Sequence, residues 1–334
     1  MSGSGTSTTP GWAVRKVTVI GCGLIGTSVG LALRRAGVRV ALADRDPRAV
    51  ATAVSRGAGV PLPAGAASDG GVTQEAGVGV PWGSGPADVV VIATPPSAVV
   101  PMLRWAQARG LGVLYTDVAS VKARLLAEAE AAGCDLGSFV PGHPMAGRES
   151  SGPGAASADL FEGRPWAVCH HPALSPHAVR AVTTLVSACG ARVVAMGAED
   201  HDRAAAAVSH APHVVSSTLA ARFAGAGEAA LILAGRGLLD VTRVAGGPSG
   251  LWCDILEHNA EPVADVLEAV AGDLDSVVAA LRSGDPARLA ALTDVLGAGN
   301  AGRSRIVRSW PGASGAPRPP VRRRQDPAPQ TYSV

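Results

Sequence analysis

The sequence predicts an α/β protein in which a doubly wound parallel sheet precedes an all-helical region. Short apolar runs typical of strands alternate with helical segments over the first half of the chain. A glycine-rich G-x-G-x-x-G stretch joins the first strand to the first helix. From about Asp200 onward, every regular segment has helical periodicity. The 334 residues are enough for two domains of ordinary size.

The first βαβ unit lies in residues 16–44. Residues 17–20 form a short apolar strand, and a helix follows at 24–36 with Gly37 as its cap. A second strand at 38–43 ends at Asp44. Two strands joined through a helix in this way run parallel.

The remaining elements follow from the same patterns. Further strands are expected at 87–96, where a Pro pair ends the run, and at 112–117, 138–140 and 164–170. A helix starts near Val121, and residues 175–197 give one more helix and a short strand. Helices are then expected at 202–223, 227–241, 249–259, 262–282 and 286–296. This organisation predicts a nucleotide-binding domain over residues 14–172 and a helical domain over residues 173–300.

Two segments lack any periodicity. Residues 57–87 are dense in Gly and Pro and carry almost no charge, which predicts a long, mobile surface excursion. From about Gly297 the helical pattern ends, and residues 301–334 form a Pro/Arg-rich tail without an apolar face. We expect this tail to be disordered.

Charge and cysteine content limit the classes of function. The tail from Arg303 holds seven Arg and one Asp, so residues 1–302 carry a net charge of −4 although the whole chain carries +2. A mildly acidic body does not suit nucleic-acid binding. Five scattered Cys without a C-x-x-C pair indicate reduced thiols in the cytoplasm. The N-terminus has no signal-peptide pattern, and the longest uncharged run, residues 17–33, is too short to span a membrane.

The motif Gly21-Cys22-Gly23-Leu24-Ile25-Gly26 is the dinucleotide-binding fingerprint of a Rossmann-type domain. Gly21 permits a tight turn, Gly23 lets the backbone approach a pyrophosphate, and Gly26 lets the helix pack closely on the strand. The helix N-terminus, at Leu24 and Ile25, supplies amide N–H groups and a partial positive charge. These residues are therefore candidate cofactor contacts.

An acidic residue indicates which dinucleotide this turn binds. Asp44 stands 23 positions after Gly21, where a carboxylate accepts hydrogen bonds from the adenosine ribose and repels a 2′-phosphate. NAD is therefore favoured over NADP, although the neighbouring Arg45 leaves NADP open. Thr94 and Pro95 follow the next strand of the sheet and are expected beside the cofactor. The alternative is a glycine-rich turn that binds no ligand.

His143 stands between Gly142 and Pro144 in the stretch PGHPMAGRES. Pro144 keeps His143 out of helical geometry, and we expect His143 in a loop at the exit of the 138–140 strand. Because parallel sheets bind ligands at the carboxyl ends of their strands, His143 is a candidate base near neutral pH. The alternative is an exposed loop histidine.

Asp117 and Ser120 follow the 112–117 strand at the same edge of the sheet, near the expected nicotinamide site. The alternative is that one of them caps the next helix.

Three basic side chains of the helical half are candidates for other sites. His210 and His213 are three residues apart on one helix face. A metal pair is conceivable, but no third ligand has useful spacing, so no metal site is predicted and core or interface histidines are favoured. Arg243 has apolar neighbours in sequence. A partly buried Arg requires a carboxylate, from the protein or from a substrate.

Together these motifs resemble those of the prephenate/arogenate dehydrogenase family of tyrosine biosynthesis. The matching stretches, in the family's order and within residues 16–296, are VIGCGLIGTSVG, DVASVK, GHPMAGRESSG, HDRAAAAVSHAPH and TRVAGGPSGLWCDILEHN. DVASVK and HPMAG are much more specific than the glycine loop. The resemblance implies an N-terminal Rossmann domain that binds NAD and a C-terminal helical domain that forms a homodimer through intertwined helices.

The resemblance also implies a reaction, the conversion of prephenate to 4-hydroxyphenylpyruvate. His143 would hydrogen-bond the ring 4-hydroxyl of prephenate and take its proton as hydride leaves C4 for NAD, while Ser120 bonds the same hydroxyl. Decarboxylation accompanies hydride transfer and aromatises the ring. Arg243 would anchor a substrate carboxylate, His210 would be a second substrate contact, and Glu149 would line or gate the pocket.

Three alternatives remain open. Arogenate differs from prephenate by an amino group in place of a keto group, and no residue decides between the two substrates. A β-hydroxyacid dehydrogenase would typically use a catalytic Lys in its helical domain, and no Lys follows Lys122. A non-catalytic nucleotide-sensing protein would be expected to lack His143 or Ser120, and both are present.

Overall fold

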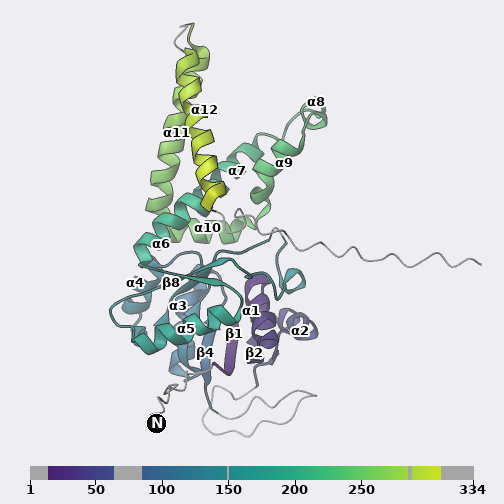
Figure 1. The fold of residues 1–334 in the computed structure, drawn as a ribbon. Coiled ribbons are helices and arrows are strands. Elements are labelled where there is room, and N and C mark those ends of the chain that lie inside the picture. The colour runs from purple at the N-terminus through teal and green to yellow at the C-terminus, as the bar shows by residue number, and fades with distance from the viewer. Residues whose placement is uncertain (1–13, 64–84, 149, 285–287, 310–334) are drawn as a thin grey trace, which may run out of the picture. The chain divides into compact units, whose positions relative to one another are not determined.

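The computed structural model describes residues 14–63, 85–148, 150–284 and 288–309 (Figure 1). The chain divides into two compact units, Met1–Val270 and Ala271–Val334. Most of the predicted excursion (residues 64–84) and the end of the predicted tail (residues 310–334) lie outside the described residues.

The first unit contains a six-stranded parallel sheet with the strand order β3-β2-β1-β4-β5-β6. The strands are β1 Lys16–Ile20, β2 Arg39–Ala43, β3 Val60–Pro61, β4 Ala87–Ile92, β5 Gly112–Asp117 and β6 Phe139–Val140. The order reverses between β1 and β4, which is the topology of a doubly wound dinucleotide-binding sheet. The predicted fold class is confirmed.

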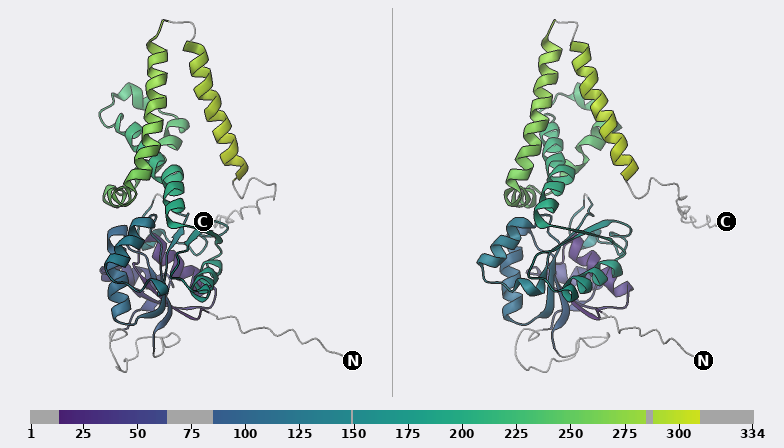
Figure 2. Two further views of the ribbon diagram at one scale, coloured as in Figure 1. Left: turned by 90° about the vertical axis from the view of Figure 1, so that its left-hand side faces the viewer. Right: turned by 60° about the vertical axis from the view of Figure 1, so that its left-hand side comes forward.

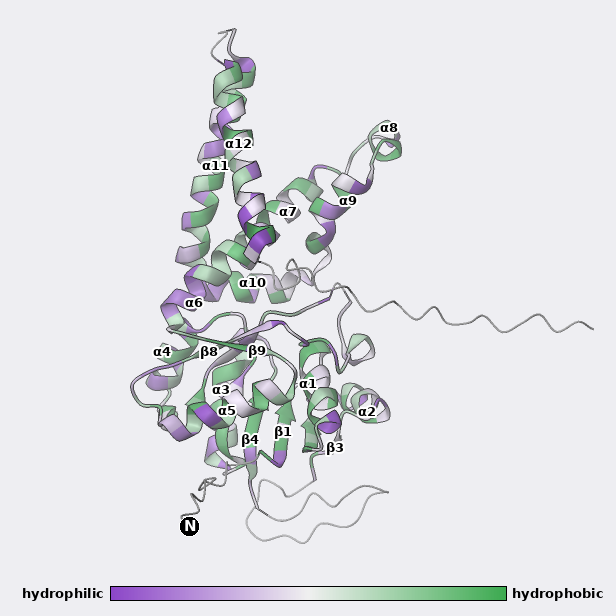
Figure 3. Ribbon diagram, in the orientation of Figure 1, coloured by the Kyte–Doolittle hydropathy of each residue, from purple (hydrophilic) through white to green (hydrophobic). Residues whose placement is uncertain are grey.

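Helices cover both faces of this sheet (Figures 1 and 2). They are α1 Leu24–Arg35, α2 Pro47–Ser55, α3 Pro96–Ala108, α4 Ala123–Ala131 and α5 Pro176–Ala188. Successive side chains of a strand point to opposite faces. Val89 and Val91 of β4 therefore pack with α1 and α5, whereas Val90 and Ile92 pack with α3 and α4. Burial on both faces explains why most strand residues are hydrophobic, as Figure 3 shows, with charged residues such as Lys16 and Arg39 at the strand ends.

Two of these helices were not expected from the sequence. Helix α2 begins with Pro47 after Asp46, whose carboxylate accepts a hydrogen bond from the Arg48 amide at 2.9 Å. Helix α3 begins with Pro96, the second residue of the Pro pair that ends the preceding strand. Proline fits the first turn of a helix, because the N–H group that it lacks has no partner there in any case. In both places Pro begins a helix as well as ending an extended segment.

A smaller three-stranded sheet contains β7 Gly142–Pro144, β8 Pro165–Cys169 and β9 Arg192–Met196. Strand β7 pairs with β8 in antiparallel register, and His143 lies opposite Ala167. The expectation that His143 lies in a loop is therefore wrong. The partner strand is more than 20 residues away in sequence, and β7 is an edge strand, where Pro144 is tolerated.

The rest of the described chain is helical. Its elements are α6 Ala198–Ala205, the π-helix η3 Ala206–His210, α7 Ala211–Ala221, α8 Glu228–Ile232, α9 Arg236–Thr242, the 3₁₀-helix η4 Arg243–Gly246, α10 Ser249–His258, α11 Ala260–Arg282 and α12 Arg288–Ser309. The predicted 227–241 helix is divided into α8 and α9, and Gly235 lies at the start of α9. Two short 3₁₀-helices, η1 Leu136–Ser138 and η2 Pro153–Ala155, lie in the first half of the chain.

The predicted end of helical structure near Gly297 is wrong. Helix α12 continues to Ser309, so the first nine residues of the predicted disordered tail are helical. Ala and Arg are strong helix formers, and this segment contains both in addition to Gly. None of the helices in the described part of the chain is both long and apolar enough to cross a membrane.

The glycine-rich turn between β1 and α1 is closely packed at two of its three glycines. Gly21 has a φ of +104°, and a Cβ atom there would lie 2.2 Å from the Ala93 carbonyl oxygen. A Cβ atom on Gly26 would lie 1.9 Å from the Gly21 carbonyl oxygen. Gly23 has no atom within 4 Å of its Cβ position. The backbone at Gly23 therefore faces open space, which leaves room for a ligand to approach.

Gly26→Ala should lower the melting temperature, because the added methyl group forces the turn apart and overpacking of this kind costs about 1–3 kcal/mol. Gly23→Ala, the matched control, should change the melting temperature much less, since its methyl group meets no atom. Thermal unfolding followed by circular dichroism makes the comparison. Equal melting temperatures for the two variants would contradict the packing described for the turn.

Candidate functional site

Asp44, at the carboxyl end of β2, lies beside the glycine-rich turn. Its carboxylate accepts a hydrogen bond from the Cys22 amide at 2.6 Å and another from the Asp46 amide at 2.8 Å. Asp44 is half-buried, so part of the carboxylate remains accessible. The predicted ribose-binding acid is thus held in a fixed orientation next to the predicted pyrophosphate-binding turn.

Asp44 lines an open hollow of about 660 Å³ in the surface. Apolar side chains of β2, α2 and β3 contribute to its walls, among them Leu42, Val50, Val54 and Pro61. An apolar hollow beside a carboxylate suits a flat aromatic base, since most ligand pockets combine apolar walls with a few polar groups.

The other predicted cofactor residues lie around the same turn. Leu24 and Ile25 are the first two residues of α1 and pack partly against the core. Thr94 follows β4, and its amide lies 3.3 Å from the Cβ position of Gly21. The Thr94 hydroxyl is buried and has no hydrogen-bond partner among the described residues, whereas Pro95 is exposed. An unsatisfied hydroxyl beside the turn suits a polar ligand.

The turn after β5 contains a fully buried ion pair between Lys122 and Asp117. The Asp117 carboxylate also accepts hydrogen bonds from the Ala119 amide at 3.0 Å and from the Gly142 amide at 3.1 Å. Gly142 is the residue before His143, so the turn after β5 holds β7 in place. The Ser120 hydroxyl, in the middle of the turn, is buried without a hydrogen-bond partner among the described residues.

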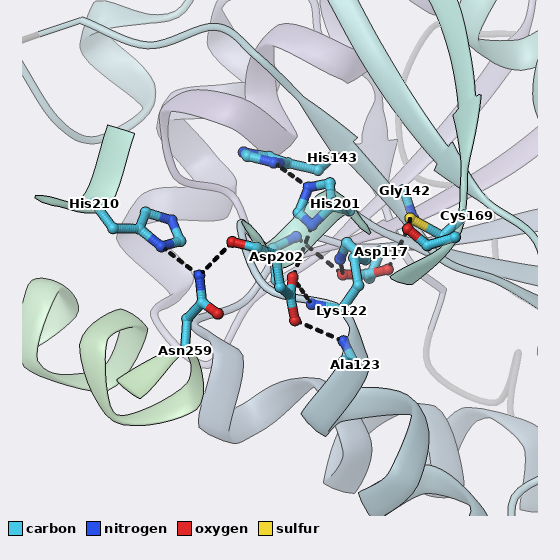
Figure 4. A network of polar contacts seen from close by, with 12 residues as sticks. Asp117, Lys122, Ala123, Gly142, His143, Cys169, His201, Asp202, His210 and Asn259 are labelled. Carbon is cyan, nitrogen blue, oxygen red and sulfur yellow. Dashed lines mark hydrogen bonds and ion pairs between the residues drawn. The ribbon is translucent and has the colours of Figure 1, made fainter. Parts of the chain in front are cut away.

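His143 is buried, with 8% of its surface exposed, so the alternative of an exposed loop histidine is wrong. Its Nδ1 atom lies 2.9 Å from Nε2 of His201, and His201 Nδ1 lies 2.8 Å from the Asp202 carboxylate (Figure 4). Burial, followed by the neighbouring His201, Lys122 and His210, lowers the pKa of His143 well below 6.5. His143 is therefore a neutral imidazole at neutral pH, able to accept a proton.

Asp202, on α6, caps helix α4. Its two carboxylate oxygens accept hydrogen bonds from the amides of Lys122 and Ala123, each at 2.8 Å. The first turn of a helix favours negative charge, because its amide N–H groups point outward. The alternative that Ser120 or Asp117 caps this helix is therefore wrong, since a residue from a distant part of the chain does so.

His210 ends the π-helix η3 and is fully buried. The Asn259 side-chain amide donates to the Asp202 carbonyl oxygen at 2.9 Å and lies 3.0 Å from His210 Nδ1. Since this amide nitrogen is a donor, Nδ1 accepts and the His210 proton is on Nε2. Burial lowers the pKa of His210 to about 4, so the ring is neutral. Its Nε2–H is a buried donor without a partner among the described residues.

His213, on α7, stacks on Trp252 of α10, with ring centroids 3.5 Å apart and an interplanar angle of 11°. Trp252 also meets the His210 ring edge-on at 6.3 Å. The prediction that His210 and His213 share one face is thus confirmed by their common contact with Trp252. Burial lowers the pKa of His213, so the stack is between two neutral rings.

Two predicted residues stand apart from this network. Arg243 begins η4, which packs against α7, and it is exposed in the single chain. The expectation that Arg243 is partly buried is therefore wrong for the single chain. Glu149 lies outside the described residues.

Four residues of the network were not predicted as site residues: Lys122, His201, Asp202 and Asn259. Lys122 is part of DVASVK, and the adjacent pair His201-Asp202 opens the stretch that contains His210 and His213. Each of the four is buried although polar or charged. Such residues are rarely buried unless they are paired, but burial cannot be read from the local sequence here.

The network offers complementary chemistry on two histidines. One ring nitrogen of His143 is engaged by His201, which leaves Nε2 for an external group. His210 presents an N–H donor, and the Ser120 hydroxyl can either donate or accept. A hydroxyl can bond His143 Nε2 or Ser120, and an anionic or carbonyl oxygen can accept from His210 Nε2–H.

Models of known protein families match most of the chain. The family model described as "Prephenate dehydrogenase, nucleotide-binding domain" matches residues 29–195, and the one described as "Prephenate dehydrogenase, dimerization domain" matches residues 197–294.

Individual proteins agree with these family models. The chain is 39% identical over 270 residues to the probable prephenate dehydrogenase NovF of Streptomyces niveus, covering 80% of this chain and 69% of that protein. It is 30% identical over 269 residues to the prephenate dehydrogenase of Bacillus subtilis, covering 78% and 68%. A solved structure of a putative prephenate dehydrogenase from Corynebacterium glutamicum is 28% identical, with a TM-score of 0.74, and the match covers 90% of this chain and 93% of that one.

Proposed function

The chain belongs to the prephenate dehydrogenase family, and we propose that it oxidises and decarboxylates prephenate to 4-hydroxyphenylpyruvate with NAD as the hydride acceptor. The observation that carries this proposal is the buried, neutral His143, which keeps one ring nitrogen available next to the dinucleotide-binding sheet. Oxidation at a carbon that bears a hydroxyl requires a base for the hydroxyl proton.

The residues around the first turn fit a dinucleotide. Open space at Gly23 and the amide groups at the start of α1 suit a pyrophosphate. Asp44, in an open hollow with apolar walls, suits an adenosine whose ribose has a free 2′-hydroxyl, which supports NAD rather than NADP. Thr94 and Pro95 would lie toward the nicotinamide. When bound, NAD supplies the acceptor for the hydride, and the protein supplies position and charge.

His143 Nε2 would accept the proton of the prephenate 4-hydroxyl as the C4 hydride leaves. The resulting ring ketone is conjugated with both ring double bonds, and the saturated carbon that bears the carboxylate lies between their far ends. The carboxylate therefore departs as CO₂, and the electrons of the broken C–C bond pass through the ring to the ketone oxygen and aromatise the ring. His143 then returns its proton to the phenolate oxygen. Prephenate and NAD thus give 4-hydroxyphenylpyruvate, CO₂ and NADH. Ser120 would hydrogen-bond the same hydroxyl and hold it toward His143.

The remaining contacts concern the two carboxylates of prephenate. The Nε2–H of His210, a donor without a partner among the described residues, suits a substrate oxygen. Arg243 would anchor a carboxylate by a bidentate pair, and Glu149 would line the pocket. Arogenate carries the same ring, hydroxyl and ring carboxylate, and it is the second candidate substrate.

The assembly and compartment are part of the same proposal. Residues 14–172 would bind the dinucleotide, and residues 173–300 would bind substrate and form a homodimer. Exposed apolar side chains on α11 support a dimer: Leu274, Val278 and Leu281 recur at helical spacing, with 57%, 42% and 63% of their surface exposed. Five cysteines without a disulfide support a reducing compartment, the cytoplasm.

Purified protein should form NADH with prephenate, and turnover with NADP should be much slower because Asp44 repels the 2′-phosphate. The measurement is NADH absorbance with prephenate and with arogenate, each offered with NAD and with NADP. If the protein turns over arogenate and not prephenate, arogenate is the substrate. Absence of turnover with all four pairs would contradict the proposed activity.

His143→Asn should lower kcat by about 10²–10⁴-fold, the usual value of a general base, and leave NAD affinity unchanged. Because the pKa of His143 is lowered, the base stays unprotonated at pH 6.5, and kcat/KM of the native enzyme should fall only at lower pH. Steady-state kinetics against pH and NAD titration by fluorescence provide the measurements. An unchanged kcat would remove His143 from the chemistry.

Leu274→Glu combined with Leu281→Glu should convert a dimer into monomers, because two buried carboxylates would face an apolar partner surface. Ser276→Glu, which adds a charge on the opposite face of α11, is the control and should remain dimeric. Sedimentation equilibrium gives the mass of each. A native chain that sediments as a monomer would contradict the proposed homodimer.

A further inference from the structure

We propose that His201 and Asp202 are positioning residues, which hold His143 in the tautomer with its proton on Nδ1 and so leave the Nε2 lone pair for the substrate hydroxyl. The inference rests on the proposed function, because it assigns the orientation of the base in that reaction. The proposal concerns a series of hydrogen bonds, each with one donor and one acceptor, that runs from the start of α4 through Asp202 and His201 to His143.

Asp202 fixes which atoms donate and which accept in this series of hydrogen bonds. Its carboxylate accepts hydrogen bonds from the amides of Lys122 and Ala123 and lies next to the Nδ1 atom of His201, each at 2.8 Å. An ionised carboxylate only accepts hydrogen bonds. Both amides belong to the first turn of α4, whose outward N–H groups attract negative charge. Asp202 is therefore the acceptor at one end of the hydrogen-bond series.

His201 links Asp202 to His143, because the proton on one of its ring nitrogens determines the role of the other. Its Nδ1 must donate to Asp202, so the Nε2 atom of a neutral His201 ring carries a lone pair. Nε2 lies 2.9 Å from His143 Nδ1, and the two rings meet edge-on with an interplanar angle of 73°. The edge-on approach aims a ring nitrogen of one histidine at the other. His143 Nδ1 is thus the donor in this contact, and its other nitrogen is unprotonated.

The proposed series of hydrogen bonds requires a lone pair on His201 Nε2. Lys122 is fully buried nearby, and its charge is balanced by Asp117 within the same turn. His210 and His143 have lowered pKa values, so both rings are neutral at neutral pH. A proton on His201 Nε2 would reverse the last hydrogen bond and place the His143 proton on Nε2. The base would then face the substrate with an N–H group and could accept no proton.

The backbone of His143 is held as firmly as its ring. The Gly142 amide donates to Asp117, and a Cβ atom on Gly142 would lie 2.9 Å from Trp166 Nε1. Pairing with β8 fixes the other side of the strand. His143 therefore has little freedom to turn away from His201.

The first test reads the tautomers directly. Protein labelled with ¹⁵N-histidine is studied by two-bond ¹⁵N–¹H correlation NMR with NAD bound, and the His143→Asn and His201→Phe variants assign the two rings. The native spectrum should show both rings with the proton on Nδ1. A His143 ring protonated on Nε2, or one that exchanges between tautomers, would overturn the proposal.

The second test compares two substitutions of His201. His201→Gln places a side-chain oxygen near the former Nε2, which can still accept from His143 Nδ1, and kcat should stay within about tenfold of native. His201→Phe keeps a ring but removes the acceptor, and kcat should fall by about 10²-fold or more, since a wrong tautomer disables a histidine base. His170→Phe, at an exposed histidine outside the network, is the control.

The outcomes separate the two proposals. Native NAD affinity and melting temperature in His201→Phe, together with lost kcat and a mixed His143 tautomer, support the positioning role. Equal losses in the Gln and Phe variants, or full activity in the Phe variant, overturn it. If the native protein turns over neither prephenate nor arogenate, the proposed function fails, and the native NMR spectrum still decides the tautomers. If His201→Phe does not fold, the native spectrum and His201→Gln decide the question.

Discussion

The buried ion pair between Lys122 and Asp117 is the contact on which the rest of the site depends. The Asp117 carboxylate accepts a hydrogen bond from the Gly142 amide of β7, and the Lys122 backbone amide donates one to the Asp202 carboxylate. The pair thus joins the parallel sheet, the smaller sheet and helix α6. Removing one partner would leave an uncompensated buried charge, which typically costs about 3–5 kcal/mol. The geometry of His143 is therefore secured by charges that do not themselves react.

The parts of the site that could be predicted are those encoded over short distances in sequence. Gly21, Gly23, Gly26 and Asp44 lie in one βαβ unit, whose local pattern dictates a turn, a helix start and an acid at a strand end. Their conformations agree with the predicted steric roles, since Gly21 and Gly26 are crowded and Gly23 is not. The helical character of the second half was also predictable, because its apolar periodicity extends over many turns, but the division into α8 and α9 and the end of α12 were not.

The unpredicted parts depend on contacts between distant segments. His201 lies 58 residues from His143, and Asp202 lies 80 residues from the helix that it caps. The strand that contains His143 exists because β8 pairs with it. The π-helix is a further case: His201 and His210 are nine residues apart, about two and a half turns of regular α-helix, which would place them on opposite sides. The wider turns of the π-helix η3 change the angle between the two side chains about the helix axis. Both histidines therefore join one network, as Figure 4 shows.

The distribution of the cysteines has a practical consequence for labelling. Burial raises the pKa of the Cys22, Cys169 and Cys189 thiols to about 12, and it also raises the pKa of the Cys134 thiol. Only thiolates react readily with maleimides and iodoacetamides. Cys253 is the exposed thiol of the five and lies on α10 beside Trp252. A fluorophore or spin label therefore attaches to the native sequence at one defined position, next to the aromatic stack and without any cysteine having to be removed.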